Sequence, residues 1–134
     1  MSLAGITAVE HPLNELKNIS RSLLDAGIHG ICFSAYGEGQ QPGDQLTEAQ
    51  VRRKLSILKP HISWVRTFSC TEGNELIAQI AHELGIKTLV GAWLGDDLEK
   101  NEAEIAGLIN LCRQGAVDVA AVGNEVLYRE DLEV

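Results

Sequence analysis

The pattern of apolar and polar positions along the chain predicts helices that alternate with strands. Residues 12–26 form an amphipathic helical pattern, with apolar side chains three or four positions apart and Gly27 as a stop signal. Short apolar runs typical of buried strands follow it at intervals. We expect strands over residues 30–34, 63–68, 87–94 and 118–122. The segments between successive strands carry helical patterns over residues 47–59, 74–84 and 99–113.

Strands that alternate with helices of this length predict right-handed βαβ units, and therefore an α/β protein with a parallel sheet. The chain has 134 residues, and a typical domain has about 100–200 residues. We therefore expect a single domain over residues 1–134. It would consist of an N-terminal helix over 12–26 and four βα units over 30–134.

Charge and cysteine content narrow the possible partners and the compartment. With 11 basic and 19 acidic residues the net charge is −8, which disfavours binding to nucleic acid or to an anionic membrane surface. The three cysteines are widely spaced and form no metal-binding pair, so we expect neither a disulfide framework nor a zinc site. Residues 1–5 do not resemble a secretory signal, and we expect a cytoplasmic protein.

Candidate chemistry lies in the loops that follow the predicted strands, because sites of α/β proteins form at the carboxyl ends of the strands. These loops carry acidic, aromatic and guanidinium side chains. Such a set suits a neutral sugar, whose hydroxyls donate to carboxylates and whose ring faces pack on aromatic rings. We expect no cofactor, because the chain has neither a dinucleotide-binding nor a P-loop glycine motif. The candidates are Tyr36, Glu38, Asp44, Arg66, Trp93, Asp96, Asp97, Asn124, Glu125, Tyr128 and Arg129.

Among these candidates, Glu125 has the position most typical of a catalytic residue. It follows the apolar run 119–122 and stands directly behind Gly123 and Asn124. A carboxyl that is half withdrawn from water at this point would suit a general acid, because desolvation favours its neutral form. A competing interpretation is that Asn124 and Glu125 cap a following helix.

Four segments, in the same order along the chain, resemble glycoside hydrolase family 17, the family of β-1,3-glucan hydrolases and glucosyltransferases. The resemblance covers roughly residues 30–130, and its motifs are specific. The matching segments are Phe33-Ser-Ala-Tyr-Gly37 with Gly39-Gln-Gln-Pro-Gly43, Trp64-Val-Arg-Thr-Phe68, Leu89-Val-Gly-Ala-Trp-Leu94 and Val122-Gly-Asn-Glu-Val126.

The resemblance implies a (β/α)₈ barrel that cleaves or transfers glucosyl units with retention of configuration. Glu125 would then be the general acid/base, and Asn124 would bind the sugar 2-hydroxyl beside the scissile bond. Arg66 would support the second carboxylate. Tyr36 and Trp93 would line the glucosyl subsites, and the expected partner is a β-glucan or an oligosaccharide.

The chain also departs from the family pattern. A barrel of this kind has eight strands and about 250 residues, whereas only four strands are predicted in the 134 residues here. The family's nucleophile is a Glu on the seventh strand, which the four predicted strands do not include. We therefore expect the N-terminal half of such an enzyme, about half a barrel with the acid/base residue but without the nucleophile, and inactive alone. Tyr128 would contact the substrate from the rim. The alternatives are a non-catalytic carbohydrate-binding or scaffold module and a flavodoxin-like protein with a different strand order.

A half barrel would leave the strands at 30–34 and 118–122 as unpaired edges. Their inward-facing side chains, Ile31, Phe33 and Val119 among them, would be open to water. Exposed edges and apolar patches drive association, so we expect a homodimer or a higher homo-oligomer. The helix over 12–26 offers a competing solution, because its apolar stripe could cover one edge or the floor of the barrel.

Overall fold

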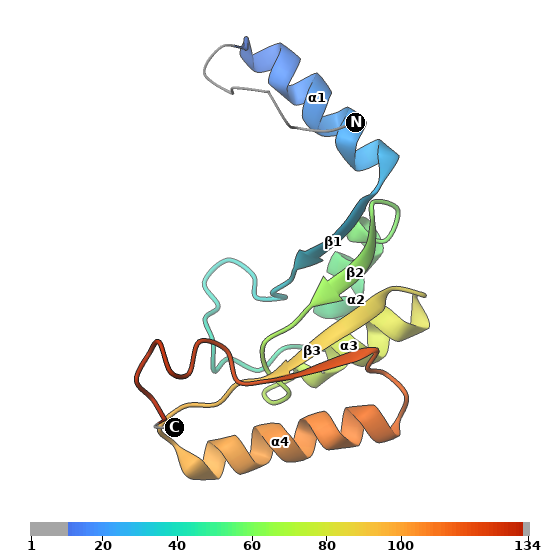
Figure 1. Cartoon of the computed structure of the whole chain (residues 1–134). Helices are drawn as coiled ribbons and strands as arrows, with labels where there is room; N and C mark the ends of the chain where they lie inside the picture. The colour runs from blue at the N-terminus through green and yellow to red at the C-terminus, as the bar shows by residue number, and fades with distance from the viewer. Residues whose placement is uncertain (1–10, 133–134) are drawn as a thin grey trace.

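The computed structural model describes residues 11–132, which form four strands alternating with helices in the predicted order (Figure 1). The elements begin and end within a few residues of the predicted bounds. In chain order they are α1 (Leu13–Ala26), β1 (Ile28–Cys32), α2 (Glu48–Leu58), β2 (Ile62–Arg66), α3 (Glu75–Glu83), β3 (Lys87–Ala92), α4 (Leu98–Arg113) and β4 (Val119–Val122).

The four strands form one parallel sheet in the order β1-β2-β3-β4. Cys32 pairs with Arg66 in the first ladder, and Ala92 pairs with Val122 in the third. The carboxyl ends of all four strands therefore lie along one edge of the sheet. A sequential order is that of a (β/α) barrel. In a flavodoxin-like sheet the spatial order is instead β2-β1-β3-β4, with β1 between β2 and β3. The flavodoxin-like alternative is therefore wrong.

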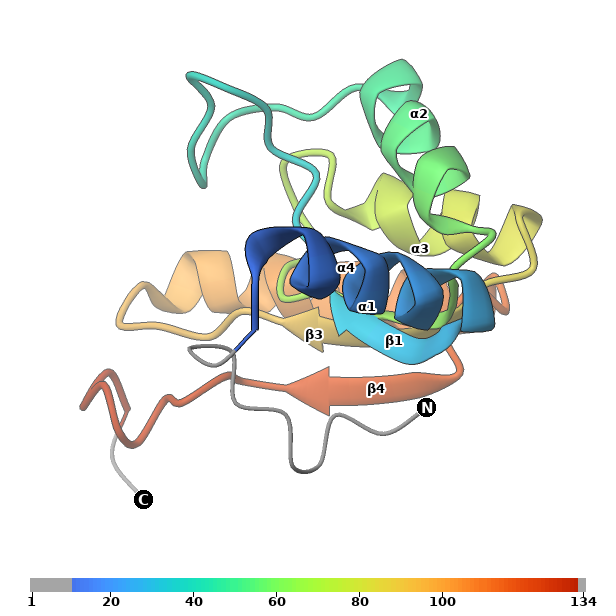
Figure 2. The same cartoon turned by 90° about the horizontal axis from the view of Figure 1, so that it is seen from above.

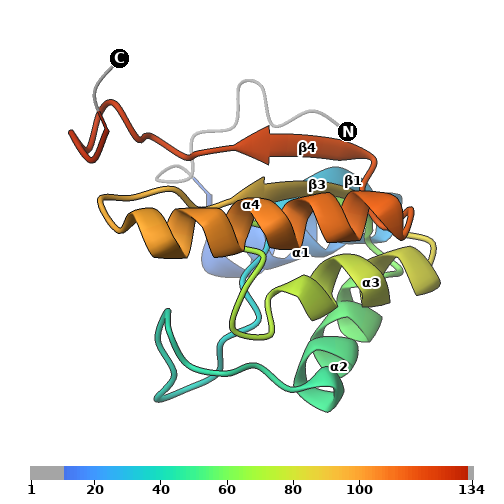
Figure 3. The same cartoon turned by 90° about the horizontal axis from the view of Figure 1, so that it is seen from below.

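Helices α2, α3 and α4 cover one face of the sheet and form the core with it (Figures 2 and 3). Helix α2 begins where the capping-box spacing predicts, because the Thr47 side chain accepts a hydrogen bond from the Gln50 backbone N–H. Its Val51 and Leu55 are fully buried. A second group of buried apolar side chains lies between β3 and α4, so the core runs along the whole helical face.

The opposite face of the sheet has no helix over it within residues 11–132 (Figure 3). Trp64 and Leu89 are half-buried there, and Val119 is exposed. The expectation that Ile31 and Phe33 are open to water is wrong. Phe33 is buried in the core with helices α2 and α3, and Ile31, which pairs with the fully buried Val65, packs against the same core.

Helix α1 stands clear of the sheet (Figure 1), so the prediction that it covers a sheet edge is wrong. Its apolar stripe is correctly predicted, but none of its residues is buried. A hydrogen bond between His61 Nδ1 and the Leu24 carbonyl (3.0 Å) links the helix to the start of β2. None of the helices within residues 11–132, α1 included, is long and apolar enough to cross a membrane.

The fourth of the predicted βα units is described only as its strand and the residues up to 132. Beyond β4 the described residues form turns over 126–130, and no α-helix follows within the part of the chain that the structure describes. The interpretation of Asn124 and Glu125 as helix caps is therefore wrong. Instead, the backbone N–H of Arg129 donates to the Glu125 carbonyl (2.8 Å), which closes one turn directly behind the strand.

Candidate active site

Asn124 and Arg66 lie together at the carboxyl edge of the sheet, as their positions after β4 and at the end of β2 predict. Arg66 Nη2 donates to Asn124 Oδ1 over 2.8 Å. The same guanidinium lies over the Phe68 ring, 4.8 Å from its centroid. Because arginine only donates, the Asn124 atom that faces it must be the carbonyl oxygen, and the amide NH₂ is left to face elsewhere. Arg66 thus orients Asn124.

Glu125 follows in a sharp turn at the end of β4. Gly123 and Glu125 both have left-handed backbone conformations, with φ values of 80° and 55°. A non-glycine residue rarely adopts this conformation, and it persists where the surrounding structure requires it. The Glu125 side chain is exposed, so the expectation that it is half withdrawn from water is wrong.

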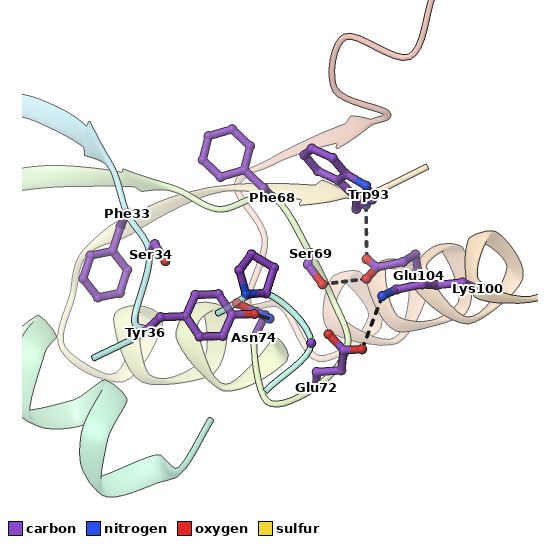
Figure 4. Close-up of a pocket in the computed structure, with 12 residues that line it drawn as sticks. Phe33, Ser34, Tyr36, Phe68, Ser69, Glu72, Asn74, Trp93, Lys100 and Glu104 are labelled. Carbon is purple, nitrogen blue, oxygen red and sulfur yellow. Dashed lines mark hydrogen bonds and ion pairs between the residues drawn. The ribbon is translucent and has the colours of Figure 1, made fainter. Parts of the chain in front are cut away.

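Tyr36 and Trp93 line one pocket of about 410 Å³ at the same edge. Figure 4 shows the two rings on different sides of this pocket. The Tyr36 hydroxyl accepts a hydrogen bond from Asn74 Nδ2 (3.0 Å). The Lys100 ammonium pairs with Glu72 over 3.3 Å at exposed positions. The lining residues are Phe33, Ser34, Tyr36, Pro42, Gly43, Phe68, Ser69, Glu72, Asn74, Trp93, Lys100 and Glu104.

Arg129 holds the Trp93 ring. Its guanidinium carbon lies 4.1 Å from the centroid of the ring, a distance typical of cation–π contacts. Arg129 Nη2 also donates to the Leu94 carbonyl (2.6 Å) and pairs with Asp131 (2.9 Å). The turn after β4 is therefore fastened to the end of β3 through one side chain. Tyr128, by contrast, is 87% exposed and is not among the residues that line the pocket.

Two side chains at the pocket were missed from sequence. Asn74 lines it from the N-cap of α3, and Glu104 lines it from the second turn of α4, rather than from the loops that directly follow strands. The sequence signal was available in part, since residues 101, 104, 108 and 111 fall on one face of a helix and all four are buried. Asn101 and Glu104 were not predicted to be buried, because polar side chains are mostly exposed in proteins.

Cys70 lies directly behind the pocket but is not a candidate nucleophile. Its side chain is buried, and its thiol donates to the Gly91 carbonyl over 3.4 Å. Burial, with a smaller contribution from the negative charge of Glu104, raises the pKa of Cys70 to about 12. The thiolate, which is the reactive form, is therefore scarce at neutral pH, and Cys70 acts as a small packed side chain.

A parallel sheet in sequential order, with acidic, amide and aromatic side chains gathered at its carboxyl edge, defines part of a (β/α) barrel. Residues 30–134 match the family described as the BtgE/BtgC glycoside hydrolase domain, and the chain belongs to that family. No curated protein matches the chain.

Solved structures of a β-1,3-glucanosyltransferase from Rhizomucor miehei, a member of glycoside hydrolase family 17, are similar to the chain. The TM-score is 0.64 and the sequence identity is 27%. One of these structures is an active-site mutant in complex with laminaritriose. The similarity covers 81% of this chain but only 41% of that chain. The 134 residues therefore correspond to less than half of the solved barrel.

Proposed function

We propose that the chain supplies the acid/base side of an active site that acts on β-1,3-glucan with retention of configuration. The arrangement at the end of β4 carries this proposal: Arg66 orients the Asn124 amide, and Glu125 follows Asn124 at the same edge of the sheet. In this proposal Glu125 is the general acid/base and Asn124 binds the sugar 2-hydroxyl. The similarity to a glucanosyltransferase whose structure holds laminaritriose supports the substrate class.

The pocket beside these residues would take a glucosyl unit. A sugar ring has apolar C–H faces and hydroxyl edges, and this pocket offers aromatic rings from Tyr36 and Trp93 together with the polar side chains of Asn74 and Glu72. The Tyr36 hydroxyl is held by Asn74, so its ring is fixed before a ligand arrives. Because a preorganised aromatic surface lowers the entropy cost of binding, the pocket suits a neutral oligosaccharide.

Binding of laminaritriose to the 134-residue polypeptide tests this proposal by isothermal titration calorimetry. Replacing Trp93 or Tyr36 by alanine is expected to weaken the Kd roughly tenfold each, the loss expected when an aromatic anchor is truncated. The matched control is Trp64→Phe on the uncovered face, which is not among the pocket residues and is expected to leave the Kd unchanged. Equal losses in all three variants, or no binding by the parent chain, would refute the proposal.

A carbohydrate-binding or scaffold module without turnover is the second candidate function. The exposed position of Glu125 favours it, because an acid that protonates a leaving group is usually withdrawn from water. Both candidates bind laminaritriose. They differ in whether the bound sugar is cleaved or transferred when a second carboxylate is present.

We also propose that the chain associates through the exposed edge strand β4. Val119 and Val122 of this strand are 43% and 65% exposed, and an apolar strand with unpaired backbone groups tends to pair with another chain. Helix α1 does not cover this edge. The simplest assembly is a twofold homodimer. Sedimentation equilibrium at micromolar concentration is expected to give the mass of a dimer, and a mass that stays monomeric would contradict this.

A further inference from the structure

The buried face of α4 changes character along its length. Leu108 and Leu111 make up its apolar half, whereas the half that lies toward the carboxyl ends of the strands consists of Asn101 and Glu104. Asn101 holds Gly95 at both of its backbone groups: Asn101 Nδ2 donates to the Gly95 carbonyl (2.7 Å), and the Gly95 N–H donates to Asn101 Oδ1 (2.8 Å). The β3–α4 loop is thus fixed by its own helix.

Glu104 holds two other segments at once (Figure 4). Its Oε1 accepts hydrogen bonds from the hydroxyls of Ser69 (2.5 Å) and Thr71 (2.6 Å). Its Oε2 accepts from the backbone N–H groups of Cys70 (2.7 Å) and Trp93 (3.2 Å). A single carboxylate therefore ties the loop after β2 to the residue directly after β3.

Burying the Glu104 carboxylate costs more free energy than burying an apolar side chain in the same place. The Glu104 side chain is fully buried, and none of the ion pairs among residues 11–132 includes it. Taking a carboxylate out of water costs several kcal/mol unless its oxygens are hydrogen-bonded, and an apolar side chain of similar size often stabilises a core as well or better. What a leucine could not do is fix the Trp93 main chain against the 69–71 loop.

We propose that Glu104 is a positioning residue, which holds the main chain of Trp93 and the 69–71 loop so that the Trp93 ring stays at the pocket wall. Arg129 holds the same ring from the turn after β4, so Trp93 is fixed through both its main chain and its side chain. The expected effect of Glu104 replacements on sugar binding rests on the proposed function. Their expected effect on the position and mobility of the Trp93 ring does not depend on it.

The four donors around Glu104 predict how different replacements behave. In Glu104→Gln the amide oxygen can accept from both backbone N–H groups, and the amide NH₂ can donate to the two hydroxyls, because hydroxyls also accept. In Glu104→Asp the shorter side chain cannot reach both segments, and the longest bond, to the Trp93 N–H, is expected to break first. Glu104→Leu removes all four acceptor contacts.

The experiment follows Trp93 alone, in a Trp64→Phe background where it is the only tryptophan of the 134 residues. Acrylamide quenching of its fluorescence reports how freely the ring moves and how exposed it is. E104D and E104L are expected to raise the quenching constant at least about twofold, because lost hydrogen bonds free the local segment, while far-UV circular dichroism stays that of the parent. E104Q and the control Glu102→Gln, at an exposed position of the same helix, are expected to match the parent.

Laminaritriose titration provides the functional arm. E104D is expected to weaken the Kd roughly fivefold, and E104Q less than about twofold, the split expected of a residue that acts by preorganising the site. A folded E104D with unchanged quenching would overturn the inference, even if E104L does not fold. Equal increases in E104D and E104Q would overturn it too. If the parent binds no laminaritriose, the proposed function fails while the quenching arm still decides the role of Glu104.

Discussion

The 134-residue polypeptide is expected to turn over laminarin at least about 10⁴-fold more slowly than the Rhizomucor miehei glucanosyltransferase, because cooperating catalytic groups lose nearly all of their effect when one is missing. A retaining glycosidase needs two carboxyl groups about 5–5.5 Å apart, one of which attacks the anomeric carbon. In the proposed site Glu125 is one of them. The resemblance places the second on a seventh strand, and residues 11–132 form four strands.

Four other acidic side chains at the same edge are engaged in structural roles. Asp97 accepts from the Lys100 N–H and caps α4, and Asp44 accepts from the Gln41 N–H within its own loop. Glu72 pairs with Lys100, and Asp131 with Arg129. These four carboxylates are therefore not free partners for Glu125.

Reducing-sugar release and transfer products from laminarin measure this prediction, with the Rhizomucor miehei enzyme as the positive control. Replacing Glu125 by glutamine is expected to leave the background rate of the polypeptide unchanged, because a general acid alone contributes only about 10²–10⁴-fold when the remaining chemistry is in place. Turnover by the parent polypeptide that disappears in Glu125→Gln would contradict the prediction. It would mean that a carboxylate within these residues acts as the nucleophile.

The sequence predicted the sheet and its edge well, because both follow from local patterns. Apolar runs separated by helical periodicity specify βαβ units, and a parallel sheet brings the carboxyl ends of its strands to one edge. For that reason Arg66 and Asn124, which are 58 positions apart, could be expected to meet, and they do. Tyr36 and Trp93 share a pocket for the same reason.

The features that the sequence did not reveal depend on tertiary contacts. Helix α1 was correctly predicted from its periodicity, but periodicity does not say what its apolar stripe packs against. The exposure of Glu125 depends on the turn that begins at Gly123, whose left-handed conformation no pattern of apolar residues encodes. The role of Glu104 was not predicted, because its four partners come from two segments that only the folded sheet brings together.

Replacing Gly73 by alanine is expected to destabilise the fold by about 3 kcal/mol, because backbone strain and overpacking each cost roughly 1–3 kcal/mol. Gly73 has a φ of 84°, which favours glycine. A Cβ at this position would lie 2.5 Å from the Leu46 carbonyl oxygen and 2.8 Å from the Leu46 nitrogen, both backbone atoms that cannot rotate away. Alanine would therefore have to displace the backbone around Leu46.

Gly85→Ala is the matched control for this prediction. Gly85 also has a left-handed conformation, with a φ of 73°, but a Cβ there would meet nothing within 4 Å. Its loss should be the conformational cost alone, about 1 kcal/mol. Urea unfolding followed by circular dichroism measures both free energies, and equal losses in the two variants would contradict the role of the close contact.

The Gly73 contact also matters for the site, because it anchors the loop that carries part of the pocket. The Leu46 N–H donates to the Glu72 carbonyl over 3.0 Å, and the Leu46 side chain is buried in the core. The chain between Tyr36 and Leu46, which supplies Pro42 and Gly43 to the pocket wall, is thus fixed at its far end by the Glu72 carbonyl and by the close approach of Gly73 to Leu46. Gly73→Ala is therefore expected to weaken laminaritriose binding even under conditions where the variant is fully folded, whereas Gly85→Ala, on the loop between α3 and β3, is expected to leave binding unchanged.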